Sequence, residues 1–192
     1  IRAGIVIPRL ARELLAAGVN ATNIVFLGAF RPFAGDEVNL APILGVDGDN
    51  EVDAMRRGME LALGPLNEPR VTGEETGRRN ESWRIWSWNV DGLSVKVVAA
   101  PSSDPSRRRA NTADTYRFWS DRVRGQDERS VLVVTTPIYV PYQGAGAVEI
   151  LGLEHGLAVE TVGVSESASD LGEYSQPFLA QNHLQEIRAA VG

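Results

Sequence analysis

The sequence predicts an α/β protein in which a mostly parallel sheet lies between two layers of helices, a three-layer Rossmann-like arrangement with an added hairpin at the sheet edge. The alternation of two kinds of segment leads to this prediction. Short apolar runs rich in β-branched residues alternate with segments of helical periodicity. Strands that alternate with helices in this way form parallel sheets joined by right-handed crossovers. The 192 residues are expected to form a single domain, because no repeat or low-complexity segment divides them.

The composition excludes several classes of function. The chain has 19 Lys and Arg residues against 25 Asp and Glu, so wholesale electrostatic binding to nucleic acid is not expected. It contains no cysteine, which excludes disulfides and thiolate metal sites, and its two histidines lack metal-ligand spacing, so no metal site is expected. No apolar run approaches the roughly 20 residues that span a bilayer, so the chain as given is expected to be soluble and cytoplasmic.

The first predicted elements are a helix and a strand. The helix covers Pro8–Ala17, because proline fits a first helical turn and Gly18 is a typical stop. The strand covers Asn23–Leu27, a continuous apolar run of the kind found in buried parallel strands. The segment from Gly28 to Asn50 is rich in Gly, Pro, Asp and Asn and predicts a long functional or mobile loop. This loop follows the carboxyl end of a parallel strand, where such sheets bind ligands.

A second helix is predicted over Asn50–Leu63 from apolar residues spaced three and four apart. Asn50 is its expected cap. Glu51 and Asp53 fall in the first turn, where the helix dipole favours negative charge, so a structural role explains both. Residues 64–81 are rich in Gly, Pro, Glu and Arg and predict an exposed insertion.

A hairpin is predicted over Ser82–Ala100, with its turn at Asp91–Gly92. By alternation Trp86 and Trp88 share one face of its first strand, which is expected to be an edge ribbon. Packing over the chain's own helices is the common use of such residues. A partner surface, including a homo-oligomer through residues 83–93, is the alternative.

Helix-start signals follow the hairpin. A helix from Asn111 to about Arg122 is predicted, with Asn111 or Thr112 as its cap. The arginines at 107–109 precede it, and a cationic run at a helix start can hold a phosphate or carboxylate. The alternative is that Asn111 and Asp114 only cap the helix while the arginines are solvated.

The remaining elements continue the alternation. Val131–Thr135 is the clearest strand, and the hydroxyls of Thr135 and Thr136 at its end could contact a ligand or simply terminate it. A polar loop over Ser165–Asp170 is expected on the same rim of the sheet. The other expected elements are a helix over Gln143–His155, a strand over Ala158–Val164 and a helix over Gln176–Ala190.

Three motifs occur in an order that is found in a known family. Asn50–Met55 is similar to a Ser-Glu-Ala-x-x-Met helix start, and Asn111–Thr115 is similar to an Asn-Thr-x-Glu-Asn motif. Val131–Pro141 is similar to a strand ending in Val-Thr-Ser and followed by Tyr-His-x-Pro-Arg. From Pro8 onward the chain thus resembles a divergent member of the YdcF, SanA and ElyC family, the bacterial domain of unknown function 218.

The resemblance implies a Rossmann-like sheet with a small-molecule cleft at the carboxyl ends of its strands. It also implies an association with cell-envelope processes or with a nucleoside-type ligand such as S-adenosylmethionine. Tyr139 and Tyr142 stand where the family has histidine and arginine, which argues against histidine-dependent chemistry.

The family's opening strand has no counterpart in this sequence. A sheet without that central strand would expose backbone edges, so an upstream segment is expected to supply it. A membrane anchor in that segment would place the domain outside the cytoplasmic membrane.

These observations favour a small-molecule-binding domain for a phosphorylated, nucleotide-like or carboxylate ligand. One alternative is a hydrolase or transferase that acts on an envelope precursor, with Glu51 or Asp114 as general base. Another is a non-catalytic interaction module built on the tryptophan hairpin. The expected ligand-binding residues are Gly28, Arg31, Glu51, Arg108, Arg109, Asn111, Thr112, Thr135, Thr136 and Tyr139.

Overall fold

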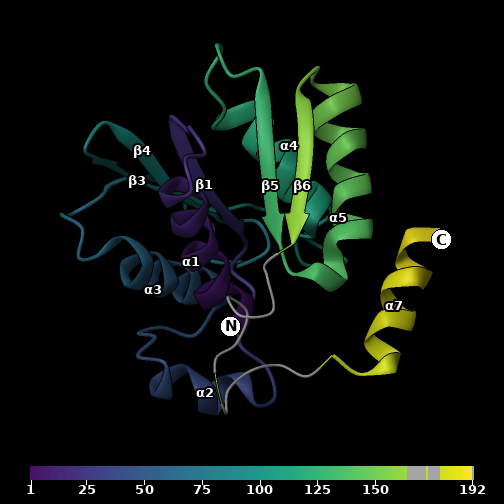
Figure 1. Cartoon of the computed structure of the whole chain (residues 1–192). Coiled ribbons are helices and arrows are strands. Elements are labelled where there is room, and N and C mark those ends of the chain that lie inside the picture. The colour runs from purple at the N-terminus through teal and green to yellow at the C-terminus, as the bar shows by residue number, and fades with distance from the viewer. Residues whose placement is uncertain (164–171, 173–177, 192) are drawn as a thin grey trace.

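The computed structural model describes residues 1–163, 172 and 178–191, and it shows a mixed α/β protein (Figure 1). Its helices are α1 (Arg2–Ala16), α2 (Glu37–Ile43), α3 (Glu51–Leu63), α4 (Thr112–Arg122), α5 (Val140–Ala147) and α7 (Ala180–Val191). A 3-10 turn, η1 (Pro137–Tyr139), precedes α5, and a π-helical stretch, η2 (Val148–Glu154), extends it. Its strands are β1 (Asn23–Gly28), β2 (Arg70–Glu74), β3 (Trp83–Val90), β4 (Leu93–Ala99), β5 (Ser130–Thr135) and β6 (Ala158–Gly163).

The described strands form two sheets, which corrects the prediction of one mostly parallel sheet. The larger sheet has the order β1-β4-β3-β2, with β1 parallel to β4 and the other two pairs antiparallel. The second sheet is the parallel pair β5-β6. The tight Asp91–Gly92 turn makes the larger sheet mixed, because a two-residue turn joins only antiparallel strands.

The first helix begins at Arg2 rather than at Pro8, so the prediction that proline starts it is wrong. Pro8 lies inside α1 and removes the N–H that would bond the Gly4 carbonyl. That carbonyl lies against Gly58 of α3, where an added Cβ would overlap it. The helix starts this early because apolar residues at its amino end are buried, namely Ile1, Ile5, Val6 and Leu10.

Two segments that were predicted to be irregular contain regular structure. The segment from Gly28 to Asn50 holds α2, which buries Leu40 and Ala41. The exposed segment 64–81 holds β2, which forms the sheet edge. The first hairpin strand, β3, therefore has neighbours on both sides and is not the predicted edge ribbon.

The hairpin itself is confirmed. Asp91 and Gly92 have φ angles of 51° and 88°, the positive values that a tight hairpin turn of this type needs. Trp86 is buried and Trp88 is half-buried, and both pack in the cluster that joins the larger sheet to α3. The aromatic area of the hairpin thus serves the chain's own core, and no observation supports association through residues 83–93.

The helix that begins at Thr112 is confirmed, and so is the strand that ends at Thr135. The next helix begins at Val140 rather than at Gln143, because Pro141 fits its first turn. The strand over Ala158–Gly163 is confirmed, whereas Val164 and Gln176 lie outside the described residues.

Helices cover both faces of the larger sheet. On one face α3 packs on Phe26 of β1 and Val97 of β4. On the other face α4 packs through Tyr116 and Trp119 on Val98 of β4. None of the described helices is both long enough and apolar enough to cross a bilayer.

Candidate functional site

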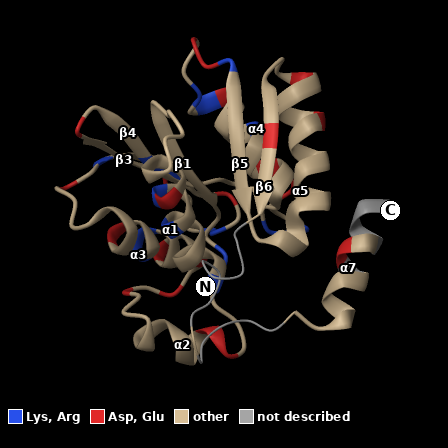
Figure 2. Cartoon of the chain, in the orientation of Figure 1, with Lys and Arg blue, Asp and Glu red and all other residues tan. Residues whose placement is uncertain are grey.

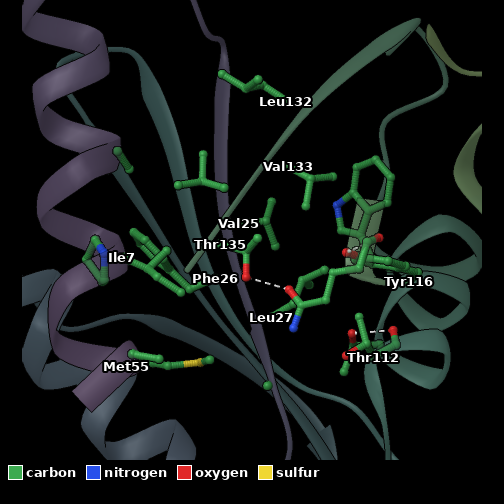
Figure 3. Close-up of a pocket in the computed structure, with 18 of the residues that line it drawn as sticks. Ile7, Val25, Phe26, Leu27, Met55, Thr112, Tyr116, Leu132, Val133 and Thr135 are labelled. Atoms are coloured by element: carbon green, nitrogen blue, oxygen red, sulfur yellow. Dashed lines mark hydrogen bonds between the residues drawn. The ribbon is translucent and has the colours of Figure 1, made fainter. Parts of the chain in front are cut away.

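A cavity of about 1840 Å³ lies between the larger sheet and the β5-β6 pair (Figure 3). It follows β1 and β5 along their length and includes the carboxyl ends of both strands. At that end α3 and α4 begin, so side chains from four elements meet there; we call this group the rim. The rim includes every predicted ligand-binding residue, namely Gly28, Arg31, Glu51, Arg108, Arg109, Asn111, Thr112, Thr135, Thr136 and Tyr139.

The start of α4 is a complete capping box. The Asn111 side chain accepts a hydrogen bond from the Asp114 N–H at 3.0 Å, and the Asp114 carboxylate accepts one from the Asn111 N–H at 2.9 Å. Arg108 also donates two hydrogen bonds to this carboxylate and one to the Ser103 hydroxyl. The cap prediction is therefore confirmed, and Asn111 rather than Thr112 is the capping residue.

The carboxylate of Asp114 is buried but remains ionised at neutral pH. Burial opposes ionisation, but the hydrogen bonds from Arg108 and from the Asn111 and Ser103 backbone outweigh it and lower the pKa of Asp114 to about 2. Such a carboxylate is a poor general base, because its low pKa makes it a weak proton acceptor and its oxygens already accept hydrogen bonds. The geometry gives Asp114 a structural role.

The three consecutive arginines differ in their surroundings. Arg107 points into solvent with an 84% exposed side chain, as the solvated alternative expects, and it does not line the cavity. Arg108 is held by Asp114. Arg109 lines the cavity, and its guanidinium has no hydrogen-bond or ion-pair partner among residues 1–163, 172 and 178–191. Arg109 is therefore the arginine of this run that is available to a ligand.

A second charged group lies across the rim, at the start of α2 and α3. Arg31 donates two hydrogen bonds to Glu37, at 2.8 and 2.9 Å, and its Nε lies 3.9 Å from a carboxylate oxygen of Glu51. The bonds from Arg31 hold the pKa of the Glu37 carboxyl well below its usual range, although burial opposes this. Charges of both signs gather near this end of the molecule (Figure 2). The rim is thus largely neutralised.

Polar groups at the end of β5 complete the rim. The Thr135 hydroxyl donates a 2.6 Å hydrogen bond to the side-chain oxygen of Gln143 (Figure 3). The ring of Tyr139 packs edge-on against Phe178 at 6.0 Å. Burial, assisted by Glu186, raises the pKa of Tyr139, so its hydroxyl stays neutral. These side chains offer hydrogen bonds without adding net charge.

Sequence reasoning missed Glu37, Met55 and Gln143, all of which line the cavity. Glu37 lies in a segment whose composition predicts a loop, although it begins α2. Gln143 is the predicted first residue of a helix that in fact begins at Val140. Met55 carries a signal that could have found it, since it follows Val52 and precedes Met59 on one helical face. Gly28 leaves room for Met55, because a Cβ there would lie 2.8 Å from the Met55 sulfur.

Two further expectations concern metals and the loop after β6. Within the part of the chain that the structure describes, no cluster of three His, Asp or Glu side chains is arranged to hold a metal ion. The polar loop over Ser165–Asp170 lies outside the described residues.

Comparison with known proteins gives relatives without known activities. The chain is 30% identical over 190 residues to the uncharacterised protein Rv3785 of Mycobacterium tuberculosis and to the uncharacterised protein Mb3814 of Mycobacterium bovis. The match covers 95% of this chain but 52% of each relative, so the chain spans about half the length of the curated relatives it matches. No protein-family model matches the chain. No solved structure matches it either.

Proposed function

We propose that this domain binds a small molecule at the rim, through an anionic group of the ligand such as a phosphate or carboxylate. The observation that carries the proposal is the convergence of every predicted ligand-binding residue on one cavity at the carboxyl ends of β1 and β5. Open α/β sheets bind ligands at this place, because strands end there and helices begin there. The sequence resemblance to the YdcF, SanA and ElyC family and a link to envelope processes belong to the same proposal.

The charges of the rim limit the ligand. Arg31 and Arg108 are neutralised by Glu37 and Asp114, which leaves Arg109 as the available cation. An exposed guanidinium beside the positive end of α4 suits one anionic group rather than a polyphosphate. Thr135 and Gln143 suit polar atoms in the body of the ligand. A sugar phosphate or a nucleoside-type ligand such as S-adenosylmethionine, whose carboxylate is its anionic group, fits this description.

The apolar wall of the cavity suits a ligand that has a ring or another flat apolar part. Leu27, Met55 and Tyr116 line the cavity beside the rim (Figure 3). Burial raises the pKa of the Tyr116 hydroxyl to about 12, so this wall is neutral over the physiological range. Ligand pockets in proteins usually combine such apolar walls with a few polar groups that fix orientation.

Catalysis is a second candidate function, and Glu51 is the residue that would perform it. Its carboxylate is about one-third exposed on the rim, and its ion pair with Arg31 is long, at 3.9 Å. It could accept a proton from a bound substrate. If a substrate is found, we expect Glu51→Gln to abolish turnover and to leave substrate affinity nearly unchanged. Full turnover by this variant would remove the assignment.

A binding screen tests the proposed function. The melting temperature is measured with inorganic phosphate, nucleotides, S-adenosylmethionine, sugar phosphates and small carboxylates. We expect at least one class to stabilise the protein, since a ligand that binds only the folded state raises its stability. Titration calorimetry then compares Arg109→Gln with the matched control Arg107→Gln. We expect Arg109→Gln to weaken binding by about tenfold or more and Arg107→Gln to leave it unchanged.

Two results would count against the proposal. One is that none of these ligands changes the melting temperature. The other is that the two arginine variants lose affinity equally, because a ligand held only by general surface charge would not distinguish them.

A further inference from the structure

The part of the cavity between β1 and β5 has the dimensions of a missing strand; we call it the trough. Every residue of both strands lines it. Residues of α1 such as Ile7 line one side of it, and Tyr116 and Trp119 of α4 line the other (Figure 3). Neither strand carries a charged residue along its length (Figure 2). The trough is therefore a long apolar space between two strand edges and two helices.

The facing strand edges carry backbone groups that pair with no strand among the described residues. The carbonyls of Thr22 and Gly28 accept hydrogen bonds from Ser94 in β4 and from Ala100 directly after it. By alternation the intervening even-numbered residues of β1 also face β4. The N–H and C=O groups of Val25 and Leu27 then point into the trough. On the other side the Arg129 carbonyl bonds β6, so the odd-numbered residues of β5 face β6. The backbone groups that point into the trough from β5 belong to Ser130, Leu132 and Val134.

The two edges run in the same direction. At the amino end the Asn23 side chain, in the first residue of β1, bonds Glu128 just before β5, at 2.9 Å. At the other end Gly28 and Thr135, the last residues of the two strands, both line the rim. A strand lying between β1 and β5 could therefore be parallel to both.

Corresponding side chains of β1 and β5 also point to the same side of the two sheets. Val25 of β1 and Val133 of β5 pack in the same cluster as α4. Phe26 and Val134, the next residues along each strand, pack on the opposite side, against α3 and α1 respectively. Side chains alternate between faces in the same sense on both edges, so the two sheets lie as parts of one sheet, with no strand between them in the part of the chain that the structure describes.

The side chains of β5 are less buried than those of β4. In β4, which has a strand on each side, Val95, Val97 and Val98 are 0% exposed. In β5, the most apolar strand, Val131–Val134 are only half-buried. The Trp119 indole N–H is buried beside the trough without a hydrogen-bond partner among the described residues. Buried donors in folded proteins nearly always have a hydrogen-bond partner.

We propose that the trough is the seat of one β-strand, parallel to β1 and β5 and contributed by the polypeptide that leads into α1. A small ligand alone does not account for a space of about 1840 Å³, since ligand pockets are roughly 300–1,000 Å³. A strand would pair both open edges at once and would cover the half-buried valines. The sheet order would become β2-β3-β4-β1, the added strand, then β5-β6.

The position of α1 identifies this occupant. The backbone nitrogen of Ile1 lies 2.7 Å from the carboxylate of Glu37, which places the start of α1 at the rim, the carboxyl end of the trough. A strand that ends at the rim and continues into α1 and then β1 forms a β-α-β unit, the standard connection between neighbouring parallel strands. The relatives are about twice the matched length, so they contain enough polypeptide for such a strand.

Hydrogen exchange tests this proposal in the protein expressed from its natural first residue. Amide exchange is measured by NMR along β1 and β5. We expect the trough-facing amides of Val25, Leu27, Leu132 and Val134 to exchange as slowly as their neighbours Phe26 and Val133, which serve as internal controls. Exchange about a hundredfold faster at the trough-facing amides than at the controls would overturn the proposal.

Cross-linking identifies the occupant in the same protein. A diazirine analogue of leucine replaces Leu132 in one sample and, as the control, the 81% exposed Leu153 in another. After irradiation we expect position 132 to cross-link to residues that precede α1 in the same chain, and position 153 to give only solvent products. A cross-link from position 132 to a second copy or to another protein would overturn the assignment to the chain's own strand. Neither readout depends on a ligand at the rim, so this proposal and the proposed function can fail separately.

Discussion

At the scale of single residues, Asp114 shows how one side chain can be read in two ways. Its place beside three arginines suggests catalysis or ligand binding, but the structure surrounds it with donors from its own helix start. A side chain that is 3% exposed and fully bonded stabilises the local fold. The ligand-binding potential of this stretch therefore belongs to its neighbour Arg109.

Asp114→Asn should lower the free energy of unfolding by about 2 kcal/mol at pH 7. The folded-state pKa of about 2 lies below the unfolded value, so the carboxylate stabilises the fold above about pH 4. This contribution is lost as the pH falls through the folded-state pKa. The free energies of unfolding of the parent and of Asp114→Asn should therefore become equal near pH 2. Urea denaturation at a series of pH values measures it.

The control for this experiment is Asp127→Asn, which changes an exposed carboxylate in the loop before β5. Its free energy of unfolding should stay within about 0.5 kcal/mol of the parent at every pH. A loss for Asp114→Asn that does not depend on pH would mean that the ionised carboxylate is not the stabilising species.

At the scale of elements, the contact between α1 and α3 determines where the amino-terminal helix lies. Two glycines make the contact close. An added Cβ at Gly58 would overlap the Gly4 carbonyl oxygen and come within 2.8 Å of the Ile5 Cα. Both obstacles are backbone atoms of α1, which cannot rotate away as a side chain can. The helix would have to move off the sheet and away from the trough that it lines.

Gly58→Ala should therefore lower the free energy of unfolding by about 3 kcal/mol, despite the better helix propensity of alanine. The matched control is Gly146→Ala in α5, where an added Cβ meets nothing within 4 Å. There alanine should raise stability by about 0.5 kcal/mol. Thermal and urea denaturation compare the two variants, and a stabilised Gly58→Ala would show that the helices pack less closely than described.

At the scale of the whole molecule, one apolar cluster joins the two sheets. Tyr116 and Trp119 of α4 contact Val98 of the larger sheet on one side and Ile150 of η2 on the other. Because η2 packs with β6, this cluster couples the β5-β6 pair to the larger sheet although the described residues of the two sheets share no strand pairing. The two sheets are therefore expected to unfold together.

Ile150→Ala tests this coupling. Ile150 is 2% exposed, and its truncation should lower the free energy of unfolding by about 3 kcal/mol. Tryptophan fluorescence reports mainly on β3 and α4, whereas far-UV circular dichroism reports on all helices and strands. The two signals should shift to lower urea concentration together. Leu153→Ala, at an exposed position of the same π-helical stretch, should change stability by less than about 0.5 kcal/mol.

Much of the local structure could be predicted because it depends on residues that are close in sequence. The Asn111 cap with Asp114 three residues later and the Asp91–Gly92 turn are examples, since each motif contains both partners of its stabilising contact. The errors lie where distant contacts override local signals. Pro8 is typical of a helix start, but α1 begins at Arg2, where its first turn packs closely against Gly58, a residue far away in sequence.

The sequence by itself determined most of the helices and strands, the caps and turns, and several of the residues that line the rim, but not Glu37 or Gln143. Only the tertiary structure decided which arginine is available, because the ion pairs of Arg31 and Arg108 depend on how loops fold back on helices. It also decided that β5 pairs with β6 and that no described strand pairs with the edge of β5 that faces β1. The physical reason is that the apolar pattern of a strand specifies its burial but not its neighbour, which is chosen by backbone pairing across the whole sheet.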